Sequence, residues 1–73
     1  MIAKQTNITI TYDADVDAAY IYLKNDITTG ESVTQIMANS NIVLDFDRDG
    51  HLIGIELLRG DLLHPDLNAT GDK

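Results

Sequence analysis

Residues 45–56, with the sequence DFDRDGHLIGIE, carry the carboxylates that a calcium-binding EF-hand loop requires. In such a loop, oxygen ligands come from positions 1, 3, 5 and 12, and a glycine at position 6 allows the sharp turn. Asp45, Asp47, Asp49, Gly50 and Glu56 occupy those positions. The chemistry available to these residues is coordination of a divalent cation, with the three aspartates and Glu56 as candidate ligands.

The flanking segments do not match an EF-hand, because that motif needs one helix entering the loop and another leaving it. Residues 42–44 are Ile-Val-Leu, which favour a strand, and the turn-forming residues 39–41 precede them. The exit contains Gly54 and Gly60, which weaken a helix. We therefore expect the turn of a β-hairpin here and no metal site.

Asp13, Asp15 and Asp17 form a second ladder of acidic residues. We expect a solvated turn in which Asp13 accepts hydrogen bonds from nearby backbone N–H groups and Asp17 caps the next element. The alternative is a weak cation site or an acidic surface that faces a partner. Such a site could include the aspartates of residues 45–49 if both turns lie at the same end of the sheet.

Residue patterns typical of catalysis are missing from the sequence. The chain has no cysteine, and no serine lies in a Gly-x-Ser-x-Gly context. His51 and His64 are the two histidines, and neither has a second ligand at metal-binding spacing. No glycine-rich run suits a phosphate group. We therefore expect a protein without enzymatic activity and without a cofactor.

The length and net charge of the chain indicate which partners and which cellular compartment to expect. The chain has 73 residues, which we interpret as one domain over residues 1–73, with residues 1–6 and 68–73 flexible. Twelve acids against five bases give a net charge of -7, which disfavours nucleic acid and suits a basic protein partner. Without cysteine or a long apolar run, we expect a cytoplasmic protein that does not enter a membrane.

Hydrophobic patterning predicts a mainly β fold, or alternatively an α+β fold, built on a small antiparallel meander of four or five strands. Residues 7–12 and 41–47 alternate between polar and apolar side chains, which is typical of a strand with one buried face. Residues 18–23 and 51–58 are apolar on both faces, and the second of these segments is predicted to be a central strand.

Two segments are less regular. Residues 31–37 have the composition of a strand, but Val33, Ile36 and Met37 would also share one face of a short helix. We favour the strand. The chain from Arg59 onward is expected to form a short helical turn or tail, with Asp66 near the start of a turn.

The hairpin prediction specifies a register. A two-residue type I′ turn at Asp49-Gly50 suits the positive φ that glycine adopts readily. It would pair Phe46 with Ile53, Leu44 with Ile55 and Ile42 with Leu57, so that three apolar pairs share one face. A four-residue loop over residues 47–50 keeps this facing, whereas a three-residue loop would reverse it.

One sheet in so short a chain has too few residues to cover both of its faces. We expect Tyr20 and Tyr22 to point away from Ile21, and Leu52 and Leu58 away from Ile55. Leucines of the tail could cover part of the second face, and a partner chain the rest. Tyr20, Tyr22, Leu52 and Leu58 are therefore candidate interface residues of a homo-oligomer, which we expect to be a dimer.

Two motifs resemble those of domain-of-unknown-function family 2283, a family of small bacterial proteins. They are residues 12–21, YDADVDAAYI, and the Asp-x-Asp-x-Asp-Gly turn followed by residues 53–58, IGIELL. The resemblance covers about residues 8–58. It implies a small β-rich fold and a prokaryotic cytoplasmic protein, and it brings no established catalytic residues.

Members of similar families are often encoded beside small ribonuclease-like toxins, so the resemblance also implies a possible antitoxin role. Our interpretation is a non-enzymatic protein-interaction module that forms a dimer and binds a basic ribonuclease-type toxin. The alternative is a domain that binds or senses divalent cations through its Asp-rich turns.

Overall fold

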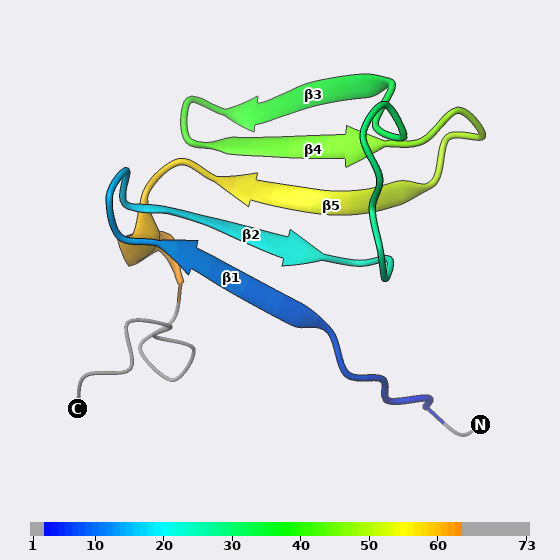
Figure 1. Ribbon diagram of the computed structural model, residues 1–73, viewed down its shortest axis with the longest axis horizontal. Helices are drawn as coiled ribbons and strands as arrows, with labels where there is room; N and C mark the ends of the chain where they lie inside the picture. Colours follow the sequence, from blue (N-terminus) through cyan, green and yellow to red (C-terminus); the bar gives the residue numbers. More distant parts are fainter. Residues whose placement is uncertain (1–2, 64–73) are drawn as a thin grey trace.

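The protein, described here over residues 3–63 of a computed structural model, is mainly β, as the sequence predicts. One antiparallel sheet contains five strands in the order β1-β2-β5-β4-β3 (Figure 1). The elements are β1 (Thr9–Asp13), β2 (Ala18–Tyr22), β3 (Thr34–Asn39), β4 (Ile42–Phe46), β5 (Leu52–Leu57) and the single 3-10 turn η1 (Gly60–Leu62).

Strands that follow one another in sequence are neighbours in the sheet, except at the connection between β2 and β3. Residues 23–33 run from the end of β2 past β5 and β4 to the far edge of the sheet (Figure 1). The order therefore differs from a simple meander at this connection. It places β5 in the middle, which confirms the predicted central strand, and residues 34–39 form a strand as favoured over a helix.

The turn between β4 and β5 is not the two-residue type predicted from Asp49-Gly50. The Asp47 N–H donates to the His51 carbonyl at 2.9 Å, and the Gly50 N–H donates to the Asp47 carbonyl at 3.1 Å. The loop is therefore the three residues 48–50, with Gly50 at a φ of 85°. A three-residue loop of this kind ends in a left-handed residue, a conformation that glycine adopts without steric cost.

A β-bulge restores the predicted register beyond this turn. Leu44 pairs with Ile55 and Ile42 with Leu57, as predicted, but the register shifts by one between Asp45 and Phe46. Phe46 pairs with Leu52, so the predicted Phe46–Ile53 pair is wrong, and Ile53 is the additional residue on β5. The longer loop and the bulge compensate one another, so the apolar side chains of Ile42 and Leu44 keep the expected facing.

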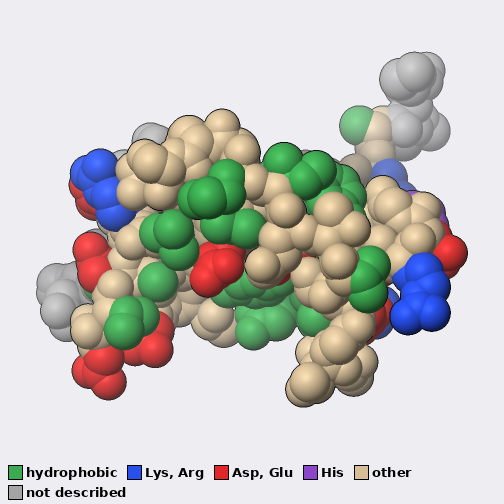
Figure 2. Space-filling view, turned by 90° about the horizontal axis from the view of Figure 1, so that it is seen from above, with side chains coloured by type: hydrophobic (Ala, Val, Ile, Leu, Met, Phe, Trp, Pro, Cys, Tyr) green, Lys and Arg blue, Asp and Glu red, His purple; other side chains and the backbone are tan. Residues whose placement is uncertain are grey.

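The buried core of the described residues is small. Four apolar side chains are buried, those of Ala19, Val43, Ile53 and Leu57, all on β2, β4 and β5. Apolar groups also remain on the surface, as Figure 2 shows from the side of β3. The exposed large ones are Ile8, Val16, Leu23, Val33, Ile36, Met37, Leu52, Leu58 and Leu62. A single sheet of this size cannot enclose all of its apolar side chains.

Candidate functional site

A hydrogen-bond network crosses four strands on one face of the sheet. The Tyr20 hydroxyl on β2 donates to Asp45 Oδ2 on β4 at 2.7 Å, and Gln35 Nε2 on β3 donates to Asp45 Oδ1 at 2.9 Å. Asp45 is only 4 % exposed. A buried carboxylate is costly unless both oxygens are hydrogen-bonded, and these two donors meet that requirement.

Gly54 is the residue that lets this network cross β5. Gly54 pairs with Tyr22 on one side and Asp45 on the other, so it lies on the face that carries the network. A Cβ atom at Gly54 would overlap the hydroxyl and ring of Tyr20, whose Cε2 atom would be 2.8 Å away. The sequence indicated Gly54 only as a residue that weakens a helix, whereas in the structure its missing side chain leaves the space that the Tyr20 ring occupies.

Burial and the Asp45 hydrogen bond both raise the pKa of Tyr20 above its ordinary value, with burial the larger cause. The hydroxyl therefore remains protonated and donates to Asp45 across the neutral pH range. Tyr20 and Tyr22 also contact each other edge to face, with ring centroids 4.7 Å apart and planes at 69°. Stacking of this kind stabilises both rings on the sheet.

The EF-hand reading of residues 45–56 does not describe this site. Strands β4 and β5 flank the loop where an EF-hand has helices, as expected from the sequence. The two carboxylate oxygens of Asp45 accept hydrogen bonds from Tyr20 and Gln35. Glu56 lies within β5, where it pairs with Val43 on β4 and with Tyr20 on β2. The structure therefore does not bring Asp45 and Glu56 together with the acids of the turn.

The hairpin tip forms a different cluster, made of Asp47, Asp49 and His51. One potential ligand atom from each residue lies within 4.8 Å of the others. Asp47 Oδ1 accepts the backbone N–H groups of Asp49 and His51, each at 2.9 Å, and His51 Nδ1 is 3.5 Å from Asp47 Oδ2. The backbone hydrogen bond from His51 is the main cause that lowers the Asp47 pKa. Asp47 therefore stabilises the turn itself.

The second acidic ladder follows β1. Asp13 Oδ1 accepts the backbone N–H of Asp15 at 3.0 Å, which confirms the expected turn contact. Asp17, at a φ of 53°, accepts the Tyr12 hydroxyl at 2.6 Å. This ladder and the hairpin tip lie at opposite ends of the sheet (Figure 1). A cation site shared between the two turns, which the sequence left open, is therefore excluded by the fold.

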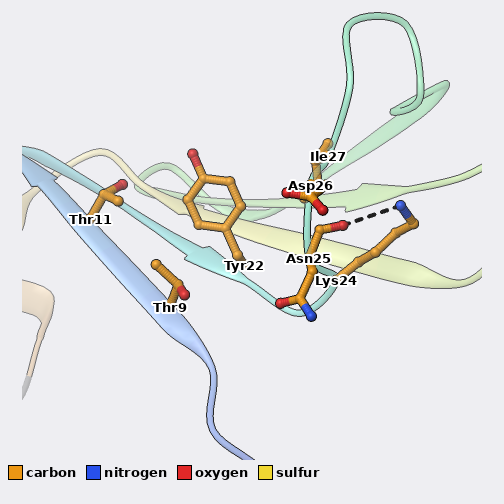
Figure 3. A pocket seen from close by; sticks show the side chains of 7 residues that line it. All are labelled: Thr9, Thr11, Tyr22, Lys24, Asn25, Asp26 and Ile27. Atoms are coloured by element: carbon orange, nitrogen blue, oxygen red, sulfur yellow. Dashed lines mark hydrogen bonds between the residues drawn. The ribbon is translucent and has the colours of Figure 1, made fainter.

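A polar groove, which the sequence did not indicate, lies between β1 and the segment after β2. Its volume is about 460 Å³, and Figure 3 shows the Tyr22 ring standing between the threonines of β1 and residues 24–27. Lys24 Nζ donates to the Asn25 carbonyl at 3.3 Å and forms an ion pair with Glu31 at 2.8 Å. The lining residues are Thr9, Thr11, Tyr22, Lys24, Asn25, Asp26 and Ile27.

The four candidate interface residues do not share one face. Tyr20 and Tyr22 are partly exposed on the network face, and their pairing partners on β5 are Glu56 and Gly54. The bulge turns Leu52 to the face of Ile55, because their partners Phe46 and Leu44 are two residues apart on β4. The prediction that Leu52 and Ile55 face opposite ways is therefore wrong. Leu52 is 36 % exposed and Leu58 is 40 % exposed.

Comparison with known proteins identifies a family for this chain, but the family's description states no function. A family described as protein of unknown function (DUF2283) matches residues 9–59. No curated protein and no solved structure matches the chain. None of the helical segments within residues 3–63 is long and apolar enough to span a membrane. The match covers both motifs and all five strands, and the chain therefore belongs to the DUF2283 family of proteins of unknown function.

Proposed function

We propose that this protein is a non-enzymatic protein-interaction module that self-associates and presents its acidic turns to a basic partner. The observation that carries the proposal is the imbalance between buried and exposed apolar side chains in the described part of the chain. Four apolar residues are buried, whereas nine large ones are exposed. Association with another chain removes such groups from water and stabilises a small sheet.

The charge distribution supports a basic protein as the second partner. The net charge is -7, and acidic turns lie at both ends of the sheet, at residues 13–17 and 47–49. Two such turns attract a basic surface and increase its rate of association at low ionic strength. The specific form of this proposal is an antitoxin-like protein that binds a basic ribonuclease-type toxin.

Light scattering after size-exclusion chromatography and a pull-down with the product of the neighbouring gene test the two parts. We expect a dimer and a complex with that product. Replacing Asp13 and Asp15 by asparagine removes two charges with little change in shape, and should weaken the complex. A stable monomer that binds no neighbouring gene product would contradict the proposal.

Tyr22→Ala tests the participation of the tyrosines in association. If the dimer forms through the tyrosines, Tyr22→Ala should weaken it, because Tyr22 is partly exposed and its hydroxyl takes no part in the network. Tyr20→Ala should weaken such a dimer as well, but it also removes the donor to the buried Asp45. Tyr22→Ala is therefore the more informative variant, and an unchanged dimer mass would argue against a tyrosine interface.

Cation binding at the hairpin tip is the second candidate function, favoured by the proximity of Asp47, Asp49 and His51. Titration calorimetry with calcium and magnesium tests it, with Asp49→Asn as the variant that removes a ligand oxygen. Glu56→Gln is the matched control because Glu56 lies within β5. Binding lost in Asp49→Asn and kept in Glu56→Gln would support a tip site, and no heat with either metal would exclude it.

A further inference from the structure

Strand β3 forms one edge of the sheet, and all six of its residues are exposed. Within residues 3–63 it pairs with β4 alone. Backbone N–H and C=O groups of a strand point alternately to its two sides, so every second residue of β3 presents a donor and an acceptor outward. An edge of this kind can bind another strand through main-chain hydrogen bonds.

The β3 edge also lacks charge, unlike most of this chain. Residues 32–44 contain no Asp, Glu, Lys or Arg, and this is the longest uncharged stretch in a sequence with 17 such residues. Figure 2 looks onto this edge and shows mostly uncharged and apolar side chains over its middle, where an acidic group is also visible, with most charged groups toward the two ends. Natural edge strands are commonly protected from pairing by charged side chains or proline, and β3 has neither.

The apolar side chains on this edge would benefit from a partner. Ile36 is 50 % exposed and Met37 is 57 % exposed, and successive residues of a strand point to opposite faces. A second strand beside β3 would therefore cover one apolar side chain on each face of the sheet. The ladder of β3 with β4 is regular from Thr34 to Met37, before the register shift that precedes Asn39.

The hydrogen-bond network of Tyr20, Asp45 and Gln35 holds β3 in place in the isolated chain. Gln35 on β3 donates to Asp45, which also accepts from Tyr20 two strands further on. An edge held in this way loses little conformational freedom when another strand binds, which favours association.

We propose that β3 pairs antiparallel with β3 of a second copy, so that two sheets join into one continuous sheet across a two-fold axis. This inference rests on the self-association part of the proposed function and assigns the interface to the β3 edge instead of the tyrosines. Tyr22 lies on β2, which β5 and β4 separate from β3, so Tyr22→Ala should then leave the dimer mass unchanged. Antiparallel pairing of identical strands is self-complementary, as a closed dimer requires.

Charge favours a second copy at this edge, because a basic partner would be attracted to the acidic turns instead. Two chains with a net charge of -7 repel each other, and the repulsion is smallest where the facing surfaces carry no charge. The β3 edge meets this condition. The opposite edge, β1, ends at Asp13 and is followed by Asp15 and Asp17.

Sedimentation equilibrium of Ile36→Lys and Met37→Lys tests the pairing. Each change puts a positive charge close to the two-fold axis, and therefore near its own counterpart in the second copy, and should raise the dimer dissociation constant at least about tenfold. Val16→Lys is the matched control, because Val16 is 65 % exposed in the β1–β2 turn and the change in net charge is identical. Circular dichroism of each variant checks that the strands are retained.

A second measurement uses the absence of cysteine in the chain. Met37→Cys creates a unique thiol, and a short bis-maleimide should link two copies through it, whereas Val16→Cys should not be linked. Loss of the dimer in both β3 variants, together with this cross-link, would support the proposal. A wild-type dimer that persists in both lysine variants would overturn pairing through β3 while leaving self-association intact. A wild-type monomer would overturn both.

Discussion

Replacing Gly54 by alanine should displace Tyr20 and destabilise the sheet. The added methyl group would overlap the Tyr20 ring and hydroxyl, so the ring must move away from β5. Movement of the ring breaks the 2.7 Å hydrogen bond to Asp45, which is 4 % exposed. A hydrogen bond to a charged group contributes about 1.5–3 kcal/mol, and forcing an additional methyl group into a packed site costs about 1–3 kcal/mol. We expect a loss of about 3–5 kcal/mol in the free energy of unfolding.

A double-mutant cycle tests the mechanism of this loss. Tyr20→Phe removes the hydroxyl and keeps the ring, so it should cost only the hydrogen bond, about 1.5–3 kcal/mol. Because both changes remove the same bond to Asp45, the double variant should lose clearly less than the sum of the two single losses. The measurement is urea unfolding at one protein concentration, since association also contributes to stability.

Two results would refute this reasoning. One is a Gly54→Ala variant whose stability is within about 0.5 kcal/mol of wild type, which is the range of ordinary surface changes. The other is full additivity in the cycle, because independent losses would mean that Gly54 and Tyr20 act on different parts of the structure.

Three further predictions concern pH, the turn and salt. Because the Tyr20 pKa is raised in the folded state, Tyr20 ionises first in the unfolded chain as pH rises above 10, and the free energy of unfolding should fall there. In a pH series of urea unfolding curves, Tyr20→Phe should show a smaller fall above pH 10. Asp47 has a lowered pKa, so its contribution to stability should decrease as pH falls below 3.8; Asp47→Ala should therefore lower the urea midpoint more at pH 7 than at pH 2. The dimer should tighten as salt is raised from 0.05 M to about 0.5 M, because salt screens repulsion between acidic chains, and weaker association measured by sedimentation would contradict the β3 proposal.

The hairpin shows how far hydrophobic patterning reaches. Alternation over residues 41–47 predicted β4, and the pairs of Ile42 and Leu44 follow from placing apolar side chains on one face. The loop length could not be obtained in this way, because two different solutions give the same facing. A two-residue loop places these side chains on one face directly, and a three-residue loop places them there when it is combined with a bulge at Ile53. The hydrophobic pattern predicts which face of the sheet each side chain lies on, but it does not predict the number of residues in the loop.

The hydrogen-bond network around Asp45 could not be predicted from the sequence pattern. Asp45 was a candidate ligand because of its spacing from the other aspartates, yet its hydrogen-bond partners come from residues 10 and 25 positions away in sequence. No local pattern contains that information, since it depends on strand order. The connection of residues 23–33 places β2 beside β5, and only then can Tyr20 reach across Gly54. The predictions concerning His64 and Asp66 lie outside the described residues.

The additional residue at Ile53 has a consequence for changes in chain length. Deleting one residue from the loop at 48–50 would invert the facing of one arm of the hairpin relative to the other, unless a compensating deletion removed Ile53 as well. The two positions thus behave as a linked pair in which insertions and deletions are tolerated together and harmful alone. Relatives with a loop one residue shorter should accordingly have a β5 without a bulge, and relatives with a three-residue loop should keep the bulge.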